Sequence, residues 1–345
     1  MKKYIIGVDG GNTKTDYFLF DSEGNFIDFH RAGTCSHEGL KDSFEGSYRV
    51  MKEVFDEFFQ KNNITVKDIK GAVFGLAGVD TPYQKKMLEE VVSRLGFENY
   101  KVVNDSFLGI KAGSINGCGV CSINGTGTSA GGIDENGTYL QVGGIGAIVG
   151  DEAGGSWLSR RAIKAVFDSC YRFGKPTMLK DIVFDFLEID EPYYMMEAIS
   201  DTMPKKRKEL PPIGVKVFEC ARKGDEVAIE LLQEMANNLA RSAGGCVVNL
   251  DFKEPVDVIL AGSVWVKGDH PTLIATFKEK IKARDEHVDR PDHRPVHRRS
   301  AGSAVRLHHR LPEGPPLHRH SGYPDHRLRL QPDLHQRSAH RRLHR

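Results

Sequence analysis

A strand that breaks on glycine and returns as a second strand occurs twice in this chain of 345 residues. The first copy is VDGGNT at residues 8–13, and the second is INGTGT at residues 123–128. Each copy has an apolar run, a turn that joins Asp or Asn to glycine, a hydroxyl side chain and a return strand. Such a repeat predicts two related domains that face each other.

The first half of the chain predicts antiparallel hairpins followed by alternating strands and helices. Residues 1–30 have the pattern of three strands joined by tight turns, and residues 41–62 carry Phe, Tyr and Met at helical spacing. Strand patterns at 72–76 and 100–103 flank a further helical pattern. This order is typical of an α/β domain, which we place at residues 1–116.

The pattern restarts at residue 118 with a strand, a glycine turn and a return strand. Helical patterns dominate residues 152–250, a buried type of strand follows at 256–260, and the last helical pattern covers 271–283. We therefore predict a second α/β domain at residues 117–284.

Both glycine turns have the chemistry of a phosphate site. Glycines expose consecutive backbone N–H groups and let the backbone approach a ligand closely. Thr13 and either Thr126 or Thr128 add hydroxyl donors. Neither turn matches the GxxxxGK[ST] loop, since each enters a strand where that loop would enter a helix. Taken alone, each turn is equally compatible with an ordinary hairpin.

A third glycine segment, LAGSV at residues 260–264, follows a buried strand late in the chain. Alone it would indicate a strand-to-helix turn. With the other two segments it resembles the actin, Hsp70 and sugar kinase superfamily, in which two phosphate hairpins and a late adenosine-binding glycine segment come in this order. The segments GVDGGNTKTD, NGTGTSAGG, GGIGAIVGDEAGGSW and LAGSVW resemble the N-acetylglucosamine kinase branch of the BadF/BadG/BcrA/BcrD ATPase family over roughly residues 4–283.

This resemblance implies an α/β fold of two ribonuclease H-like, actin-like ATPase domains around a nucleotide cleft. It implies an enzyme that uses ATP and Mg²⁺ to phosphorylate an amino sugar, most simply N-acetylglucosamine. Asp9 would hold Mg²⁺ through water, because that ion favours one or two carboxylates together with phosphates. The expected nucleotide and phosphate contacts are Gly10, Gly11, Asn12, Thr13, Lys14, Gly125, Thr126, Gly127, Gly262 and Ser263.

Asp105 is the candidate catalytic base. Phosphoryl transfer to an alcohol needs a residue that accepts the hydroxyl proton, and Asp105 ends a strand just before the second half begins. Its alternative role is the N-cap of a helix over 106–112, for which Asp is a preferred residue. The resemblance favours the base, since a strand-end Asp here holds the acceptor hydroxyl in similar kinases.

The resemblance also assigns sugar contacts to Asp151 and to the turn Gly144-Ile145-Gly146, with Thr128 and Ser129 beside them. Asp151 has an alternative role at the N-terminus of a helix, where its charge would suit the helix dipole. Many relatives have Trp at the position of Ile145, and they place Asn where this chain has Ser36, which lacks the paired donor and acceptor of an amide. His37 is a weaker candidate, since a lone His is more often structural.

Two further classes of function remain as alternatives. The acceptor could be glucosamine or N-acetylmuramic acid, or the protein could be an activase-type ATPase that acts on a partner protein. Such activases carry an iron–sulfur cluster, and Cys118 and Cys121 form a CxxC. On a strand these two side chains point to opposite faces, and the sequence has no second CxxC, so a buried core position is the favoured interpretation.

The six cysteines are scattered, and the sequence starts without a signal peptide and has no stretch of the length that spans a membrane. We therefore expect reduced thiols and a cytoplasmic location. The partners we expect are ATP and a small sugar, with no nucleic acid and no membrane; a homodimer is compatible with the sequence.

The amino-acid composition changes abruptly near residue 284. Residues 285–345 contain 13 Arg, no Lys, no Phe and 11 of the 14 His. This break favours a change of reading frame between Ala283 and His287 over a native basic or metal-binding tail. In the superfamily that the chain resembles, a further strand and helix follow at this point, so the resemblance implies that the domain at 117–284 is truncated. We expect the segment to be disordered and the chain to be unstable or nearly inactive. Resequencing around codon 284 tests this, and an alternative frame without an apolar, helix-forming continuation would contradict it.

Overall fold

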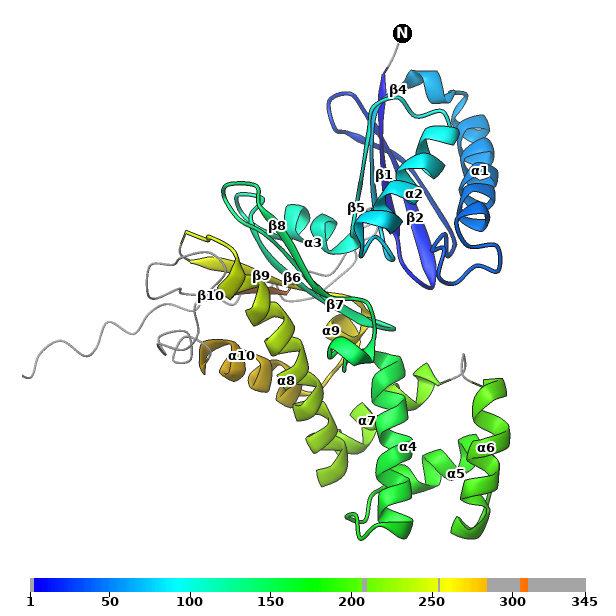
Figure 1. Ribbon diagram of the computed structural model, residues 1–345, viewed down its shortest axis with the longest axis vertical. Coiled ribbons are helices and arrows are strands. Elements are labelled where there is room, and N and C mark those ends of the chain that lie inside the picture. Colours follow the sequence, from blue (N-terminus) through cyan, green and yellow to red (C-terminus); the bar gives the residue numbers. More distant parts are fainter. Residues whose placement is uncertain (1–2, 207–209, 254, 284–304, 310–345) are drawn as a thin grey trace, which may run out of the picture.

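Two five-stranded sheets, one in each half of the chain, form the framework of the computed structural model, which describes residues 3–206, 210–253, 255–283 and 305–309 (Figure 1). The first sheet has the order β3-β2-β1-β4-β5 and consists of β1 (Tyr4–Gly10), β2 (Lys14–Asp21), β3 (Phe26–Gly33), β4 (Ile69–Leu76) and β5 (Tyr100–Val103). The second has the order β10-β9-β6-β7-β8 and consists of β6 (Gly119–Asn124), β7 (Thr128–Ile133), β8 (Tyr139–Gly143), β9 (Val256–Ala261) and β10 (Val305–His309).

The two sheets repeat one topology. In the first, β1 pairs antiparallel with β2 and parallel with β4; in the second, β6 pairs antiparallel with β7 and parallel with β9. The two glycine turns occupy equivalent places, between β1 and β2 and between β6 and β7. The internal repeat predicted from the sequence is thereby confirmed.

Helices α1 (Ser43–Asn62) and α2 (Pro82–Arg94) cover the first sheet and close its core. Phe55 of α1 is buried among aromatic rings, with centroids 5.0 Å from Phe97 and 5.2 Å from Tyr17. The helical spacing seen in the sequence places the apolar side chains of α1 on its buried face. The helix is capped by Asn63, which has a left-handed φ of 53°. The predicted helix over 41–62 is confirmed.

The second half is dominated by helices, as its sequence predicts. In Figure 1 the 24-residue helix α8 lies along the second sheet beside α10, while α4 to α7 extend away from it. The helices of this half are α4 (Gly155–Tyr171), α5 (Leu179–Leu187), α6 (Met195–Lys206), α7 (Pro211–Arg222), α8 (Glu226–Asn249), α9 (Ser263–Lys267) and α10 (Pro271–Ala283), with short 3-10 turns at Ala147–Val149 and Pro192–Tyr194. None of the helices described is long and apolar enough to cross a membrane.

Helix α3 (Asp105–Gly113) joins the two halves and contacts both sheets. Its Phe107 and Ile110 form an apolar cluster with Cys121 of β6. Gly109 permits this approach, because a Cβ on it would lie 2.5 Å from the Cys121 sulfur. Helix α3 precedes the predicted domain boundary at 116/117 but packs largely on the second sheet, so the start of α3 is held at the junction of the two halves.

The cysteines favour the core interpretation of the CxxC. Cys121 lies on β6 and is buried, whereas Cys118 lies just before that strand and is only half-buried. Within the described residues there is no group of three or more His, Cys, Asp or Glu side chains that could hold a metal.

The strand β10 corrects one expectation about the C-terminal segment. Val305–His309 pairs parallel with β9 over five residues, whereas the composition predicts disorder throughout 285–345. Strand pairing uses backbone N–H and C=O groups, which any residue except Pro supplies, and β9 offers an edge beside β6. The amino-acid composition therefore does not indicate whether a segment can pair with a neighbouring strand. Residues 284–304 and 310–345 lie outside the described part of the chain.

Candidate active site

A cleft of about 440 Å³ lies where the two halves meet. Both glycine hairpins line it, together with the start of α3, the loop after β4 and the segment before α4. Of the sequence-predicted residues, those that line the cleft are Gly11, Asn12, Thr13, Lys14, Asp105, Gly125, Thr126, Gly127, Thr128, Ser129, Gly144, Gly146, Asp151 and Ser263. Segments far apart in the sequence thus form one concave surface.

The tips of the two glycine hairpins face each other across this cleft. The hydroxyl oxygens of Thr13 and Thr126 are 3.2 Å apart. Each turn is closed by its own backbone bond, from the Gly11 N–H to the Lys14 carbonyl at 2.9 Å and from the Gly125 N–H to the Gly127 carbonyl at 3.0 Å. Threonine hydroxyls and glycine-rich backbone from both halves therefore lie together in the cleft, a composition that suits a chain of phosphates.

Gly10 and Gly262 are not among the residues that line the cleft. A Cβ on Gly10 would lie 2.7 Å from the Leu76 side chain, so this glycine lets β1 pack against the first core. Gly262 has φ 103°, and a Cβ there would lie 2.6 Å from the Asn124 carbonyl oxygen. Both glycines permit close packing next to the hairpins: Gly10 leaves room for a core side chain, and Gly262 leaves room for the backbone of β6. Their sequence neighbours Gly11 and Ser263 line the cleft.

Asp105 begins α3 and lines the cleft. The helix cap is Asn104, whose Oδ1 accepts a hydrogen bond from the Ser106 N–H at 3.0 Å. The alternative role of Asp105 as the N-cap is therefore wrong, because its neighbour has that position. Burial, and then the carboxylates of Asp9 and Asp80, raise the pKa of Asp105 to about 7. A carboxylate with such a pKa can accept a proton near neutral pH.

Asp80 is a cleft residue that the sequence analysis missed. It lies on the loop after β4 and accepts hydrogen bonds from the side chains of Asn104, at 3.1 Å, and Gln141. Burial raises its pKa to about 6. A signal was present, because the carboxyl ends of parallel strands share one edge of a sheet, and Asp80 follows β4 much as Asp105 follows β5.

Asp151 lies four residues before α4, so it is not at the N-terminus of that helix and the dipole alternative is wrong. Its Oδ2 accepts a hydrogen bond from the Gly146 N–H at 2.5 Å. A Cβ on Gly143 would lie 2.2 Å from Asp151 Oδ1. The carboxylate is thus held against residues 143–146. Ile145 in that loop is exposed and is not among the lining residues.

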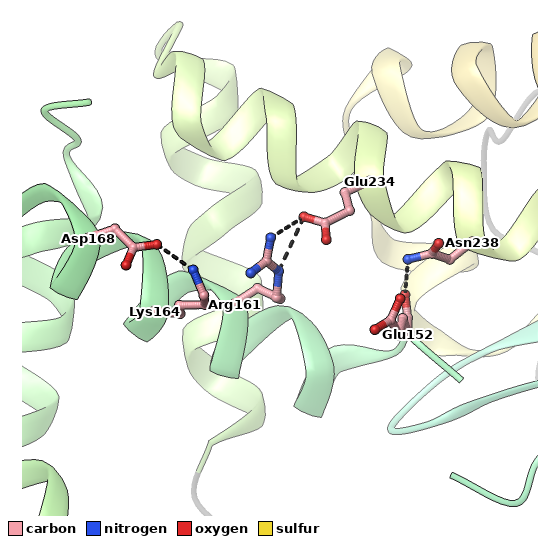
Figure 2. Close-up of polar contacts among 6 residues, drawn as sticks. All are labelled: Glu152, Arg161, Lys164, Asp168, Glu234 and Asn238. Carbon is pink, nitrogen blue, oxygen red and sulfur yellow. Dashed lines mark hydrogen bonds and ion pairs between the residues drawn. The ribbon is translucent and has the colours of Figure 1, made fainter. Parts of the chain in front are cut away.

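Polar contacts between α4 and α8 fix the segment that follows Asp151. Figure 2 shows Arg161 of α4 paired with Glu234 of α8, with its Nη2 2.5 Å from Glu234 Oε2. In the same view the Asn238 side chain donates to the Glu152 carbonyl at 3.0 Å. Arg160, which precedes Arg161 on α4, lines the cleft and was not predicted from the sequence. The long helix α8 therefore holds this wall of the cleft from behind.

Ser36 and His37 are buried and are not among the lining residues. The His37 ring stacks on Phe44 with centroids 4.2 Å apart, and burial lowers its pKa. Both lie behind Gly78, since a Cβ on Gly78 would be 2.8 Å from the His37 ring. Ser36 and His37 thus expose no surface in the cleft for the expected contact with a sugar. Their neighbours Gly78 and Glu38 line the cleft instead.

Asp9 lies at the end of β1, opposite Asp16 of β2. The Asp16 carboxylate is bound by Arg31, at 2.6 Å and 2.8 Å, and by Lys14 at 3.0 Å. Asp9 is exposed, yet desolvation by the protein around it, and then the charge of Asp16, raise its pKa. A single carboxylate beside a phosphate site fits Mg²⁺, which takes most of its ligands from water and phosphate.

The chain is similar to known proteins in both sequence and fold. Residues 6–293 match the BadF/BadG/BcrA/BcrD ATPase family. The chain is 28% identical over 265 residues to the N-acetylmuramic acid/N-acetylglucosamine kinase of Clostridium acetobutylicum and 25% identical over 274 residues to the N-acetyl-D-glucosamine kinase of Dictyostelium discoideum. Each match covers 76% of this chain and 85% of the relative.

A solved structure from Chromobacterium violaceum, assigned as an N-acetylglucosamine kinase, has a TM-score of 0.63 and 24% identity, over 82% of this chain and 93% of that one. This likeness and the two repeated sheets confirm the predicted fold of two actin-like domains. The family match extends over most of the sequence, and the chain therefore belongs to the BadF/BadG/BcrA/BcrD ATPase family.

Proposed function

We propose that this protein is an ATP-dependent kinase that phosphorylates a hydroxyl of an amino sugar, with N-acetylglucosamine as the first candidate. The observation that carries the proposal is the position of Asp105. It lines the same cleft as the two glycine hairpins and as the loop at residues 143–146, which binds the Asp151 carboxylate. The names of the two curated relatives, both amino-sugar kinases, support the substrate class. The acceptor of the Clostridium acetobutylicum relative also makes N-acetylmuramic acid a candidate.

In the proposed reaction the two hairpins bind the phosphates of ATP. The acceptor hydroxyl loses its proton to Asp105 while its oxygen forms a bond to the γ-phosphorus. The bond from that phosphorus to the β–γ bridging oxygen breaks, and ADP leaves with the electron pair. Lys14 and Arg160 supply positive charge to the cleft, and Mg²⁺ held through Asp9 would neutralise charge on the phosphates.

The sugar side of the cleft is proposed to be formed by Asp151, Thr128 and Ser129 with residues 143–146. The Asp151 carboxylate accepts hydrogen bonds from sugar hydroxyls, as the Gly146 N–H bond leaves it acceptor capacity. We further propose domains at 1–116 and 117–284 and a location in the cytoplasm, with ATP and a small sugar as partners. A homodimer is compatible with this proposal, and we expect neither nucleic acid nor a membrane as a partner.

A coupled assay of ADP release over a panel of sugars tests the proposal. The panel contains N-acetylglucosamine, N-acetylmuramic acid, glucosamine and glucose, with a sample that lacks sugar. We expect one or more of the amino sugars to stimulate ADP release above the rate without sugar. ADP release that is equal with and without every sugar would contradict the proposal and favour an activase-type ATPase.

The pH dependence of kcat/KM for the sugar should follow the ionisation of Asp105. Its pKa of about 7 means that the base is protonated, and inactive, at lower pH. We expect kcat/KM to fall about tenfold for each pH unit below that value and to level off above it. The measurement is a pH profile at saturating Mg·ATP. A profile that stays flat from about pH 5.5 to about pH 7.5 would remove Asp105 as the base.

A further inference from the structure

Asp80 occupies the centre of a chain of hydrogen bonds that crosses the cleft. One oxygen, Oδ1, accepts from Asn104 Nδ2 at 3.1 Å and from Gln141 Nε2. Asp80 and Asn104 belong to the first half of the chain, whereas Gln141 lies on β8 of the second. Among the described residues, this oxygen thus connects the end of the first sheet to the edge strand of the other.

On one side, Asp80 orients the start of α3. Asn104 is almost fully buried, with 2% of its surface exposed, and uses both ends of its amide. Its Nδ2 donates to Asp80, and its Oδ1 accepts from the Ser106 N–H. Because the bond to Asp80 determines which end of the amide faces the helix, it also determines how α3 begins. Asp105, the candidate base, is the first residue of that helix.

On the other side, Asp80 contacts the loop at residues 143–146. Gln141 Nε2 donates to the Gly143 carbonyl at 3.1 Å as well as to Asp80. A Cβ on Gly144 would lie 2.8 Å from Gln141 Nε2 and 2.9 Å from Asp80 Oδ1, so the loop passes directly over this pair. The same loop holds Asp151 through the Gly146 N–H.

We infer that Asp80 is a positioning residue, which couples the orientation of the candidate base to that of the sugar-side loop through Asn104 and Gln141. The inference deepens the proposed function and rests on it. Asp80 acts on Asp105 and Asp151 through their neighbours, and on Asp105 also through its charge. No such role follows from the sequence, because the two donors are separated from Asp80 by 24 and 61 positions.

The charge of Asp80 adds a second link to Asp105. Burial, and then the charges of Glu38 and Asp151, raise the pKa of Asp80 to about 6, although the hydrogen bond from Gln141 opposes this rise. Asp105 is the carboxylate on which Asp80 acts in turn. At neutral pH the Asp80 carboxylate is mostly ionised, and its negative charge raises the pKa of Asp105. A change that removes this charge and keeps the shape should therefore lower the pKa of Asp105.

Asp80→Asn and Gln141→Leu separate the two links. Asn keeps the Oδ1 acceptor but removes the charge, so the acid limb of the kcat/KM profile should move to lower pH by several tenths of a unit. Leu keeps the bulk of Gln141 but removes the donor, so the KM for the sugar should rise about tenfold, while the KM for ATP stays unchanged. The matched control is Asp134→Asn, a buried carboxylate that closes the turn after β7.

Carbon-13 NMR titration of the Asp105 carboxyl group, in protein without ligands, tests the link independently of activity. We expect a lower titration midpoint in Asp80→Asn than in the unchanged protein or in Asp134→Asn. An unchanged midpoint, or a sugar KM that Gln141→Leu leaves as it was, would overturn the inference. If the unchanged protein transfers phosphate to no sugar, the proposed function fails, and the titration still decides whether Asp80 acts on Asp105.

Discussion

Replacing Asp105 by Asn is expected to lower kcat by about 10²–10⁴-fold, the usual contribution of a general base. The amide has the size of the carboxylate but cannot accept the proton of the acceptor hydroxyl. Asn104, which caps α3, is unchanged, so the variant should fold. Affinity for ATP should stay the same, since the two hairpins do not depend on this side chain.

Single-turnover kinetics and calorimetric ATP binding measure these two effects separately. Asp134→Asn serves as the matched control, because it makes the same chemical change at a buried position outside the cleft. The control should keep its turnover. Near-normal turnover in Asp105→Asn would exclude the role of base and would leave Asp105 as a residue that only shapes the cleft.

Replacing Asp9 by Asn is expected to lower the affinity for ATP in the presence of Mg²⁺ by about a hundredfold, since a bound metal ion contributes several kcal/mol at a phosphoryl site. The Asp9 carboxylate is the group proposed to hold the ion through water. Its loss also removes one of the charges that raise the pKa of Asp105, so that pKa should fall as well.

Titration of ATP affinity against Mg²⁺ measures this effect. The unchanged protein should bind ATP more tightly as Mg²⁺ rises, and Asp9→Asn should respond weakly. In the presence of a chelator the two proteins should bind ATP alike, which is the internal control. An identical Mg²⁺ response in both would assign the ion to other ligands.

The parts of the fold that depend on local pattern could be predicted from the sequence. The repeated glycine turns predicted two equivalent hairpins, and apolar spacing predicted α1 and α10, because both signals are contained in a few neighbouring residues. Asp105 could be singled out because it follows a strand pattern. Its near-neutral pKa could not, since that depends on burial and then on the charges of Asp9 and Asp80, which only the tertiary structure brings close.

The errors have the same origin. Asp80 was missed because its partners are distant in sequence. The burial of Ser36 and His37 next to Gly78 could not be predicted for the same reason. At positions 10 and 262 close packing requires glycine. A sequence motif cannot distinguish such a glycine from one that contacts a ligand. The strand β10 was missed because pairing to β9 uses the backbone, and composition reports only on side chains.

The most direct test of the proposed activity follows the γ-phosphate itself. The protein, in excess over ATP labelled at the γ-phosphorus, is incubated in turn with N-acetylglucosamine, N-acetylmuramic acid and glucosamine, and the products are separated. Excess protein makes even slow transfer measurable. We predict that the label moves to a sugar phosphate. Label that appears only as inorganic phosphate or on a polypeptide, or stays in ATP with every amino sugar, would contradict an amino-sugar kinase.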